Sequence, residues 1–276
     1  MAERLPLTPD EFRALADRVV ELAAGLLAEL PRARAFPETS GAETSAVFDA
    51  PLPEEGLGPE ALDALTRVVA LSRLPGPRFF GYVLGSGEPV AALADLLVSV
   101  LNQNVTAWRS SPAAVTIERT VVRWLAEAIG CPGFVGSLTG GGSSANLMAL
   151  AMARESRAPA NASGVTPGGV FYASSEVHMS IPRAAAVLGL GHAGVHEVPV
   201  DEALRMDVEA LERAVEQDLA AGRKPIAVVA TAGTVSTGSI DPLASIAAVA
   251  RRRGLWMHVD GAYGALAALA IREAFD

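Results

Sequence analysis

The feature of this sequence that most constrains its fold is the regular alternation of short β-branched runs with helical stretches after Gly130. The runs are "GGVFYAS" (168–174), "GVHEVPV" (194–200), "PIAVVATAG" (225–233) and "LWMHVD" (255–260). Stretches of helical periodicity, such as "DVEALERAVEQDLAAG", separate them. Strands joined by helices pair in parallel, since the crossover returns the chain to the same end of the sheet. The alternation therefore predicts an α/β fold with a mainly parallel sheet and helices on both faces.

The sequence before Gly130 is mainly helical in pattern and predicts an N-terminal helical segment. In its first helix, Thr8 suits the N-cap, Pro9 suits the first turn, and leucines recur at helical spacing. A Pro-rich stretch over residues 31–56 predicts an extended connection. The predicted helices are residues 8–30, 59–73, 89–103 and 111–130.

Composition excludes several classes of protein. The net charge is −9 and the longest basic run is Arg251–Arg253, which argues against nucleic-acid binding. No apolar run approaches the roughly 18 residues of a membrane span, and the first residues are polar and charged rather than signal-like. A single cysteine, Cys131, forms no internal disulfide. We therefore expect a soluble cytoplasmic protein that binds neither nucleic acid nor membrane.

In parallel α/β sheets the ligand lies at the carboxyl ends of the strands. Polar residues follow three of the predicted strands: Ser174 and Ser175, the 231–234 segment, and Asp260. Asp260 stands among apolar and small residues, where a carboxylate is costly unless it is paired or hydrogen-bonded. We therefore expect Asp260 to have a cationic or hydrogen-bonding partner.

Asp260 has several possible roles. A metal site would need several neighbouring ligands, and only His258 is close in sequence. A dehydrogenase ribose contact would place the acid about 20 residues after the glycine turn, and the actual separation from Gly142 is 118 residues. Two roles remain for Asp260. It either faces a cation carried by a ligand or is a structural aspartate that caps the next helix.

The stretch "GSLTGGGSSANLMALAMAR" (136–154) places glycines and serines directly before a helix. Backbone N–H groups at a helix N-terminus bind phosphate, and glycines let the phosphate approach. The stretch is neither a Walker loop nor a G-x-G-x-x-G fingerprint. A flexible connection with Ser143 or Ser144 as an ordinary N-cap is the alternative.

Two further residues follow predicted strands. His178 lies at the start of a helix, where it is either a capping or surface residue or a ring that stacks on a flat ligand. Thr234 lies in "VATAGTVSTGSIDPL", which is either a turn held by hydroxyl groups or a set of donors for a ligand. Together with the glycine turn and Asp260, they provide a phosphate seat, a stacking ring, a hydroxyl donor and a carboxylate at one sheet edge. A flat phosphorylated pyridine, pyridoxal 5′-phosphate, suits all four.

Six segments, in the same order, resemble those of the group II pyridoxal-phosphate amino-acid decarboxylases, the family of the aromatic-amino-acid and glutamate decarboxylases. The resemblance implies the type I fold, a homodimer with shared active sites, and decarboxylation of an L-amino acid to an amine and carbon dioxide. It makes residues 1–105 a helical and extended dimerisation segment and residues 106–276 the cofactor-binding large domain. The segments are "FFGYVLGSG", "WRSSPAAVTIERTVVRWL", "GSLTGGGSSANLMAL", "YASSEVHMSIPRAAAVLG", "ATAGTVSTGSIDPL" and "HVDGAYGA".

The resemblance also implies a role for each cofactor-binding residue. Gly142 and Ser143 correspond to residues that hold the phosphate. His178 corresponds to the histidine that stacks on the pyridine ring and helps to orient the substrate carboxylate. Thr234 lies beside the ring, and Asp260 pairs with the ring nitrogen. His178 and Asp260 are therefore the expected catalytic residues, and no metal is expected.

Other matching positions surround the ring and the substrate. Ala262 corresponds to the residue packed under the ring face, while "FFGYVLGSG" and the region of Trp108 resemble segments of the substrate pocket. Gly85 departs from the pattern, because the aromatic decarboxylases tend to carry a hydroxyl residue there. Gly261 replaces a usual alanine, a mild change.

The family attaches its cofactor to a lysine about 30 residues beyond the strand-end aspartate, whereas this sequence ends at Asp276. Its only lysine, Lys224, precedes a predicted strand and belongs at the opposite sheet edge. We therefore expect the chain to be the N-terminal portion of a decarboxylase, truncated on the C-terminal side of its large domain, with weak or no catalysis. Another type I pyridoxal enzyme (an aminotransferase or carbon–carbon lyase) and a non-catalytic remnant are the alternatives.

Overall fold

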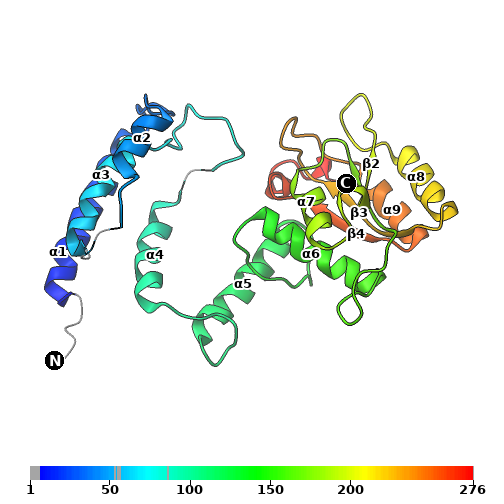
Figure 1. Cartoon of the computed structure of the whole chain (residues 1–276), viewed down its shortest axis with the longest axis horizontal. Helices are drawn as coiled ribbons and strands as arrows, with labels where there is room; N and C mark the ends of the chain where they lie inside the picture. The colour runs from blue at the N-terminus through cyan, green and yellow to red at the C-terminus, as the bar shows by residue number, and fades with distance from the viewer. Residues whose placement is uncertain (1–6, 53, 55–56, 86, 276) are drawn as a thin grey trace. The chain divides into compact units, whose positions relative to one another are not determined.

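The computed structural model describes residues 7–52, 54, 57–85 and 87–275. The chain divides into two compact units, Met1–Leu101 and Asn102–Asp276 (Figure 1). The first is helical and the second contains the sheet. Each unit is described by itself.

The first unit confirms the predicted long helix and corrects the predicted connection. The first helix begins after Thr8, whose side chain accepts the Glu11 N–H while the Glu11 carboxylate accepts the Thr8 N–H. This capping box satisfies two N–H groups that the helix leaves free. The connection expected to be extended over residues 31–56 contains a helix with a second capping box, Ser40 with Glu43, which composition alone did not reveal. The helices are α1 (Pro9–Glu29), α2 (Gly41–Phe48), η1 (Gly58–Asp63), α3 (Ala64–Ala70) and α4 (Pro89–Leu101).

The second unit confirms the predicted parallel sheet. Its four strands pair in parallel in the order β2-β1-β3-β4, so that β1 and β3 are central. The strands are β1 (Gly169–Ser174), β2 (Val195–Val198), β3 (Lys224–Thr231) and β4 (Trp256–Asp260). The helices are α5 (Pro112–Ala128), α6 (Gly142–Arg157), α7 (Ser180–Val187), α8 (Val208–Ala220) and α9 (Leu243–Arg253), with short turns η2 (His192–Gly194), η3 (Ala265–Leu269) and η4 (Arg272–Ala274).

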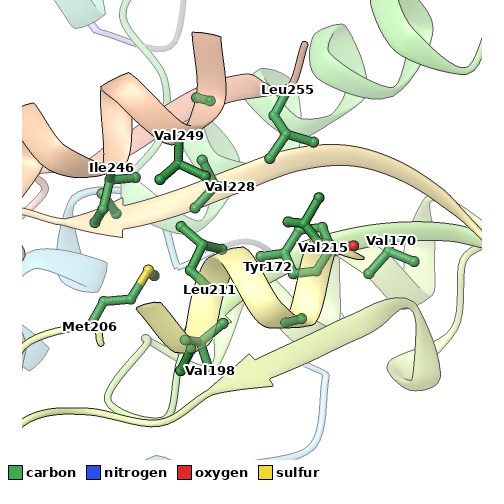
Figure 2. Packing of buried hydrophobic residues seen from close by; sticks show 14 residues of the cluster. Val170, Tyr172, Val198, Met206, Leu211, Val215, Val228, Ile246, Val249 and Leu255 are labelled. Atoms are coloured by element: carbon green, nitrogen blue, oxygen red, sulfur yellow. The ribbon is translucent and has the colours of Figure 1, made fainter. Parts of the chain in front are cut away.

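Helices cover both faces of the sheet. Because successive strand residues point to opposite faces, each central strand contributes side chains to two separate apolar clusters. On one face, Tyr172 and Val228 pack with Leu211 of α8 and Ile246 of α9 (Figure 2). On the other face, apolar strand residues pack with α6 and α7. That second cluster includes Leu150, Ala153, Phe171, Ala173, Ile181, Ala184, Ala185 and Val229.

A polar cluster ties the outer strand β2 to helix α8. The buried carboxylate of Asp218 accepts hydrogen bonds from the Tyr172 hydroxyl (2.9 Å) and from Arg223 (3.0 Å), and lies 2.8 Å from His196 Nδ1. Burial acts to raise the pKa of Asp218, but the hydrogen bonds from His196 and Tyr172 and the Arg223 charge hold that pKa below its ordinary value. The cluster therefore stabilises the folded state through an ionised carboxylate.

We expect Asp218→Asn to lower the free energy of unfolding by about 2 kcal/mol at pH 7, since it removes a charged acceptor from buried donors. Because the folded pKa of Asp218 is depressed, its stabilisation is present above the unfolded pKa of about 4 and is lost as the pH falls through the folded pKa. Urea denaturation at pH 7 and at pH 3 measures both effects. Glu212→Gln, which removes an exposed ion pair of α8 with Arg252, is the control and should change stability little. A variant Asp218→Asn with wild-type stability at pH 7 would contradict the assignment.

Candidate active site

The carboxyl ends of β3 and β4 bring Thr231 and Asp260 side by side. The two residues are partners in the parallel register, so their side chains lie on the same face of the sheet, the face covered by α6. Both are buried, with exposed fractions of 4% and 7%. The predicted convergence of strand-end polar residues is present at this edge.

Within the part of the chain that the structure describes, the Asp260 carboxylate accepts hydrogen bonds from neutral donors only. Its Oδ2 accepts from Asn146 Nδ2 (2.8 Å) and its Oδ1 accepts from the Ala262 backbone N–H (3.1 Å). Among the described residues, Asp260 forms no ion pair. Asp260 does not cap the next helix, because η3 (Ala265–Leu269) has Gly264 at its N-cap and no side-chain cap, and the carboxylate is a buried anion that a ligand cation can neutralise.

Asn146, on the second turn of α6, connects Asp260 to two histidines. Its amide nitrogen also donates to Ser180 Oγ (2.9 Å), and its amide oxygen lies 2.8 Å from His258 Nε2. Ser180 Oγ in turn lies 2.8 Å from His178 Nδ1. A continuous chain of hydrogen bonds therefore runs from His178, before α7, to Asp260, at the end of β4.

The environment keeps His258 neutral. Burial lowers the pKa of His258 below its ordinary value, and the negative charge of Asp260 offsets only part of that effect. A neutral imidazole has one donor and one acceptor nitrogen. His258 therefore contributes a hydrogen bond rather than a charge to this edge.

The glycine turn lies next to the Asp260 turn. Helix α6 begins at Gly142 with Gly141 as its N-cap, and no side chain caps it, so neither Ser143 nor Ser144 serves as the ordinary N-cap. A Cβ added to Gly142 would lie 3.0 Å from the Ala262 Cβ, which places the start of α6 directly against the turn after Asp260. The uncapped N–H groups of this first helical turn are available to an anion.

Thr234 is buried in the loop after β3 and is not part of the Asp260 network. Its Oγ1 lies 2.6 Å from Thr237 Oγ1, so its hydroxyl is engaged within the loop, as the turn interpretation proposed. Asp241 anchors the same loop by accepting the Thr231 N–H and the Met206 N–H, both at 2.7 Å. Burial raises the pKa of Asp241 although these two hydrogen bonds lower it.

Two buried hydroxyls at this sheet edge lack partners among the described residues. Ser174 Oγ, at the end of β1, lies on the sheet face covered by α8 and α9, whereas Thr231 Oγ1 lies beside Asp260 on the face covered by α6. A buried hydroxyl without a hydrogen bond is energetically costly, and the Thr231 hydroxyl is the one available to a polar ligand beside Asp260. The Asp260 carboxylate, the Thr231 hydroxyl and the uncapped first turn of α6 form a donor and acceptor set that fits a phosphorylated heterocyclic cation.

Lys224 is remote from this set. It is the first residue of β3 and is exposed, whereas Thr231 is the last residue of that strand. Seven residue steps at about 3.3 Å separate the two by about 23 Å. The structure thus confirms that Lys224 belongs to the opposite sheet edge. Within the described ranges, no group of three or more His, Cys, Asp or Glu side chains could hold a metal ion.

Two described aromatic residues of the predicted substrate segments are exposed. Phe80 is 94% exposed and belongs to the first unit, Trp108 is 57% exposed in the second, and Ser86 lies outside the described residues. Sequence reasoning also missed Asn146, Ser180 and Asp241. For Asn146, the available signal was a polar residue at the buried helical position four before Leu150.

A buried strand-end aspartate at the carboxyl ends of a parallel sheet suits the role of partner to the pyridinium nitrogen of pyridoxal phosphate. The pyridoxal-dependent decarboxylase conserved domain matches residues 49–275. The chain therefore belongs to the pyridoxal-dependent decarboxylase family.

Individual relatives agree with this assignment. The aromatic-L-amino-acid decarboxylase of Bacillus atrophaeus is 34% identical over 98% of this chain and 56% of its own length. The human cysteine sulfinic acid decarboxylase is 37% identical over 68% of this chain and 39% of its own length. The crystal structure of mouse CSAD superposes with a TM-score of 0.88 at 31% identity, covering 98% of this chain and 59% of that one. The chain spans about half the length of the curated relatives it matches, and its fold is that of the type I pyridoxal enzymes.

No helix in the described part of the chain has the length and apolar character needed to cross a bilayer. The predictions that the chain is cytoplasmic and is one portion of a longer enzyme remain predictions.

Proposed function

We propose that this chain contributes the cofactor site of an enzyme that decarboxylates an L-amino acid to an amine and carbon dioxide. The observation that carries the proposal is the buried, hydrogen-bonded carboxylate of Asp260, which has no cation and lies against an uncapped helix start. A strand-end carboxylate of this kind suits a protonated ring nitrogen. The family assignment selects decarboxylation over amino transfer or carbon–carbon cleavage as the reaction.

Pyridoxal 5′-phosphate supplies an aldehyde that condenses with amines and a pyridinium ring that accepts electrons. In this proposal the Gly142 and Ser143 backbone groups bind its phosphate, and Asp260 holds a proton on the ring nitrogen by opposite-charge stabilisation. His178 covers the ring face and orients the substrate carboxylate. These roles need the α6 start, the β4 end and the segment before α7, which the hydrogen bonds bring together.

Two further residues complete the proposed site. Ala262 packs under the ring, supported by the closeness of the Gly142 and Ala262 positions. Thr234 lies beside the ring, supported by its place in the loop that follows β3. Relatives of similar identity are named for aromatic and for sulfinic substrates, so we propose no particular amino acid.

We also propose a cytoplasmic homodimer, with residues 1–105 as the dimerisation segment. No described residue of α1, α2, α3 or α4 is buried, and α4 exposes Val90, Leu93 and Leu97 by 60% or more. Exposed apolar faces of this kind indicate a partner surface. A single cysteine suits a reducing compartment. Sedimentation equilibrium tests the dimer, and a monomer at micromolar concentration would contradict it.

Equilibrium dialysis of the 276-residue chain with pyridoxal 5′-phosphate tests the proposed function. We expect saturable binding of one cofactor per chain, competed by excess inorganic phosphate, because the phosphate seat is a helix start. Lys224→Arg removes the only lysine without touching the site and should bind equally well, which separates site binding from reaction with an exposed amine. Absence of binding, or binding that disappears with Lys224→Arg, would overturn the proposal. Release of carbon dioxide from a panel of L-amino acids then identifies the substrate.

A further inference from the structure

We propose that Asn146 and Ser180 are positioning residues that fix the Asp260 carboxylate and set His178 in a single tautomer, with its proton on Nε2. The inference rests on the proposed function for its consequence in cofactor binding. The tautomer itself follows from hydrogen-bond chemistry within the chain. Asn146 and Ser180 act on the site through Asp260 and His178 and touch no reacting atom.

The amide of Asn146 has only one orientation that satisfies its neighbours. Its nitrogen carries two protons, and these meet Asp260 Oδ2 at 2.8 Å and Ser180 Oγ at 2.9 Å. The opposite orientation would set the amide oxygen against the Asp260 carboxylate, two acceptors with no proton between them. The amide oxygen therefore faces His258 Nε2 at 2.8 Å, and this nitrogen must carry the proton.

Ser180 transmits the same constraint to His178. Because Ser180 Oγ accepts from Asn146, its single proton is free to be donated to His178 Nδ1, 2.8 Å away. The backbone N–H of Ser180 also points to this nitrogen, at 3.2 Å. Two donors directed at Nδ1 require an unprotonated nitrogen, so neutral His178 carries its proton on Nε2.

This tautomer gives His178 an N–H donor at Nε2. Nε2 lies across the imidazole ring from Nδ1, so its N–H is directed away from Ser180 and α7. In that state His178 donates to an anionic group and cannot accept a proton at Nδ1 without losing its Ser180 partners. An N–H donor matches a carboxylate on the ligand.

The central members of the network are buried, whereas His178 and His258 are partly exposed. The exposed fractions are 4% for both Asn146 and Ser180 and 7% for Asp260, so water does not replace a lost partner. A buried polar network is costly when one member is missing. The hydrogen-bonded partners come from four separate segments: α6, the start of α7, the segment before it, and β4.

Ring nitrogen–hydrogen correlation spectra of the histidine-labelled chain test the tautomer without cofactor. The chain has four histidines, at 178, 192, 196 and 258, which single substitutions assign. We expect His178 and His258 each to appear as one Nε2–H species. Ser180→Ala should convert His178 into a mixture of the two neutral tautomers, whereas Ser180→Thr should retain the single species. Asn146→Ala should likewise convert His258 into a mixture of tautomers. A proton on Nδ1 of His178 in the unsubstituted chain would overturn the proposal.

Cofactor affinity tests the positioning role. Asn146→Ala and Ser180→Ala should each weaken pyridoxal 5′-phosphate binding about tenfold, the equivalent of one hydrogen bond of about 1.4 kcal/mol. Tyr172→Phe removes an equally buried hydroxyl from the Asp218 cluster on the other sheet face, and it should leave affinity and the His178 spectrum unchanged. If the folded Asn146→Ala or Ser180→Ala chain binds pyridoxal 5′-phosphate with unchanged affinity, the proposed positioning role is wrong. If the unsubstituted chain binds no cofactor, the proposed function fails while the spectra still decide the tautomer.

Discussion

Replacing Asp260 by alanine is expected to weaken pyridoxal 5′-phosphate binding by about 10- to 100-fold, because a charge-assisted hydrogen bond contributes roughly 1.5 to 3 kcal/mol. In the active enzyme the same change should reduce turnover further, by several kcal/mol of transition-state stabilisation, because without the carboxylate the ring nitrogen would lose its proton and the ring would accept electrons less well. The physical reason is that the carboxylate is buried and already oriented by Asn146 and by the Ala262 N–H. It therefore meets a ring cation without reorganisation.

The matched variant is Asp260→Asn, which keeps the volume and a hydrogen-bonding group but removes the negative charge. We expect Asp260→Asn to lose most of the affinity that Asp260→Ala loses, which assigns the effect to charge rather than to a cavity. Equilibrium dialysis measures the affinity, and urea denaturation confirms that each variant is folded. Near-normal affinity and turnover for Asp260→Asn would contradict the role of the carboxylate.

The sheet and the polar residues at the carboxyl ends of its strands were predictable from the sequence because both depend on local patterns. Each strand is a short β-branched run, and each predicted run between Gly130 and Asp260 forms a strand of the parallel sheet. The carboxyl-edge rule then located Thr231 and Asp260 without any contact information. Helix α2 was missed because its length is only eight residues and its signal is a capping box rather than periodicity.

The network behind the site was not predictable in the same way. Asn146 meets Asp260 across 114 residues of sequence and Ser180 across 34. Strand order and helix placement decide which distant polar side chains meet, and no local pattern encodes that choice. His258 illustrates the limit, because the sequence marked it only as a metal ligand too isolated to count, whereas it is a hydrogen-bond partner of Asn146.

We expect Gly264→Ala to destabilise the protein strongly, because Gly264 packs tightly against Ala232 in the loop after β3. A Cβ at Gly264 would lie 2.3 Å from the Ala232 carbonyl oxygen, much closer than two non-bonded atoms can approach. The Ala232 N–H also donates to the Asp260 carbonyl, so the loop after β3 and the turn after β4 must separate together.

We expect this overpacking to lower the free energy of unfolding by about 3 kcal/mol and to displace the Asp260 turn from the start of α6. Cofactor affinity should therefore fall by more than tenfold, although Gly264 touches no ligand. Gly136→Ala is the matched control, because its Cβ would meet only Val122, at an ordinary 3.4 Å. Urea denaturation and equilibrium dialysis on both variants separate the outcomes. If Gly264→Ala loses stability but keeps wild-type cofactor affinity, then the turn does not position Asp260.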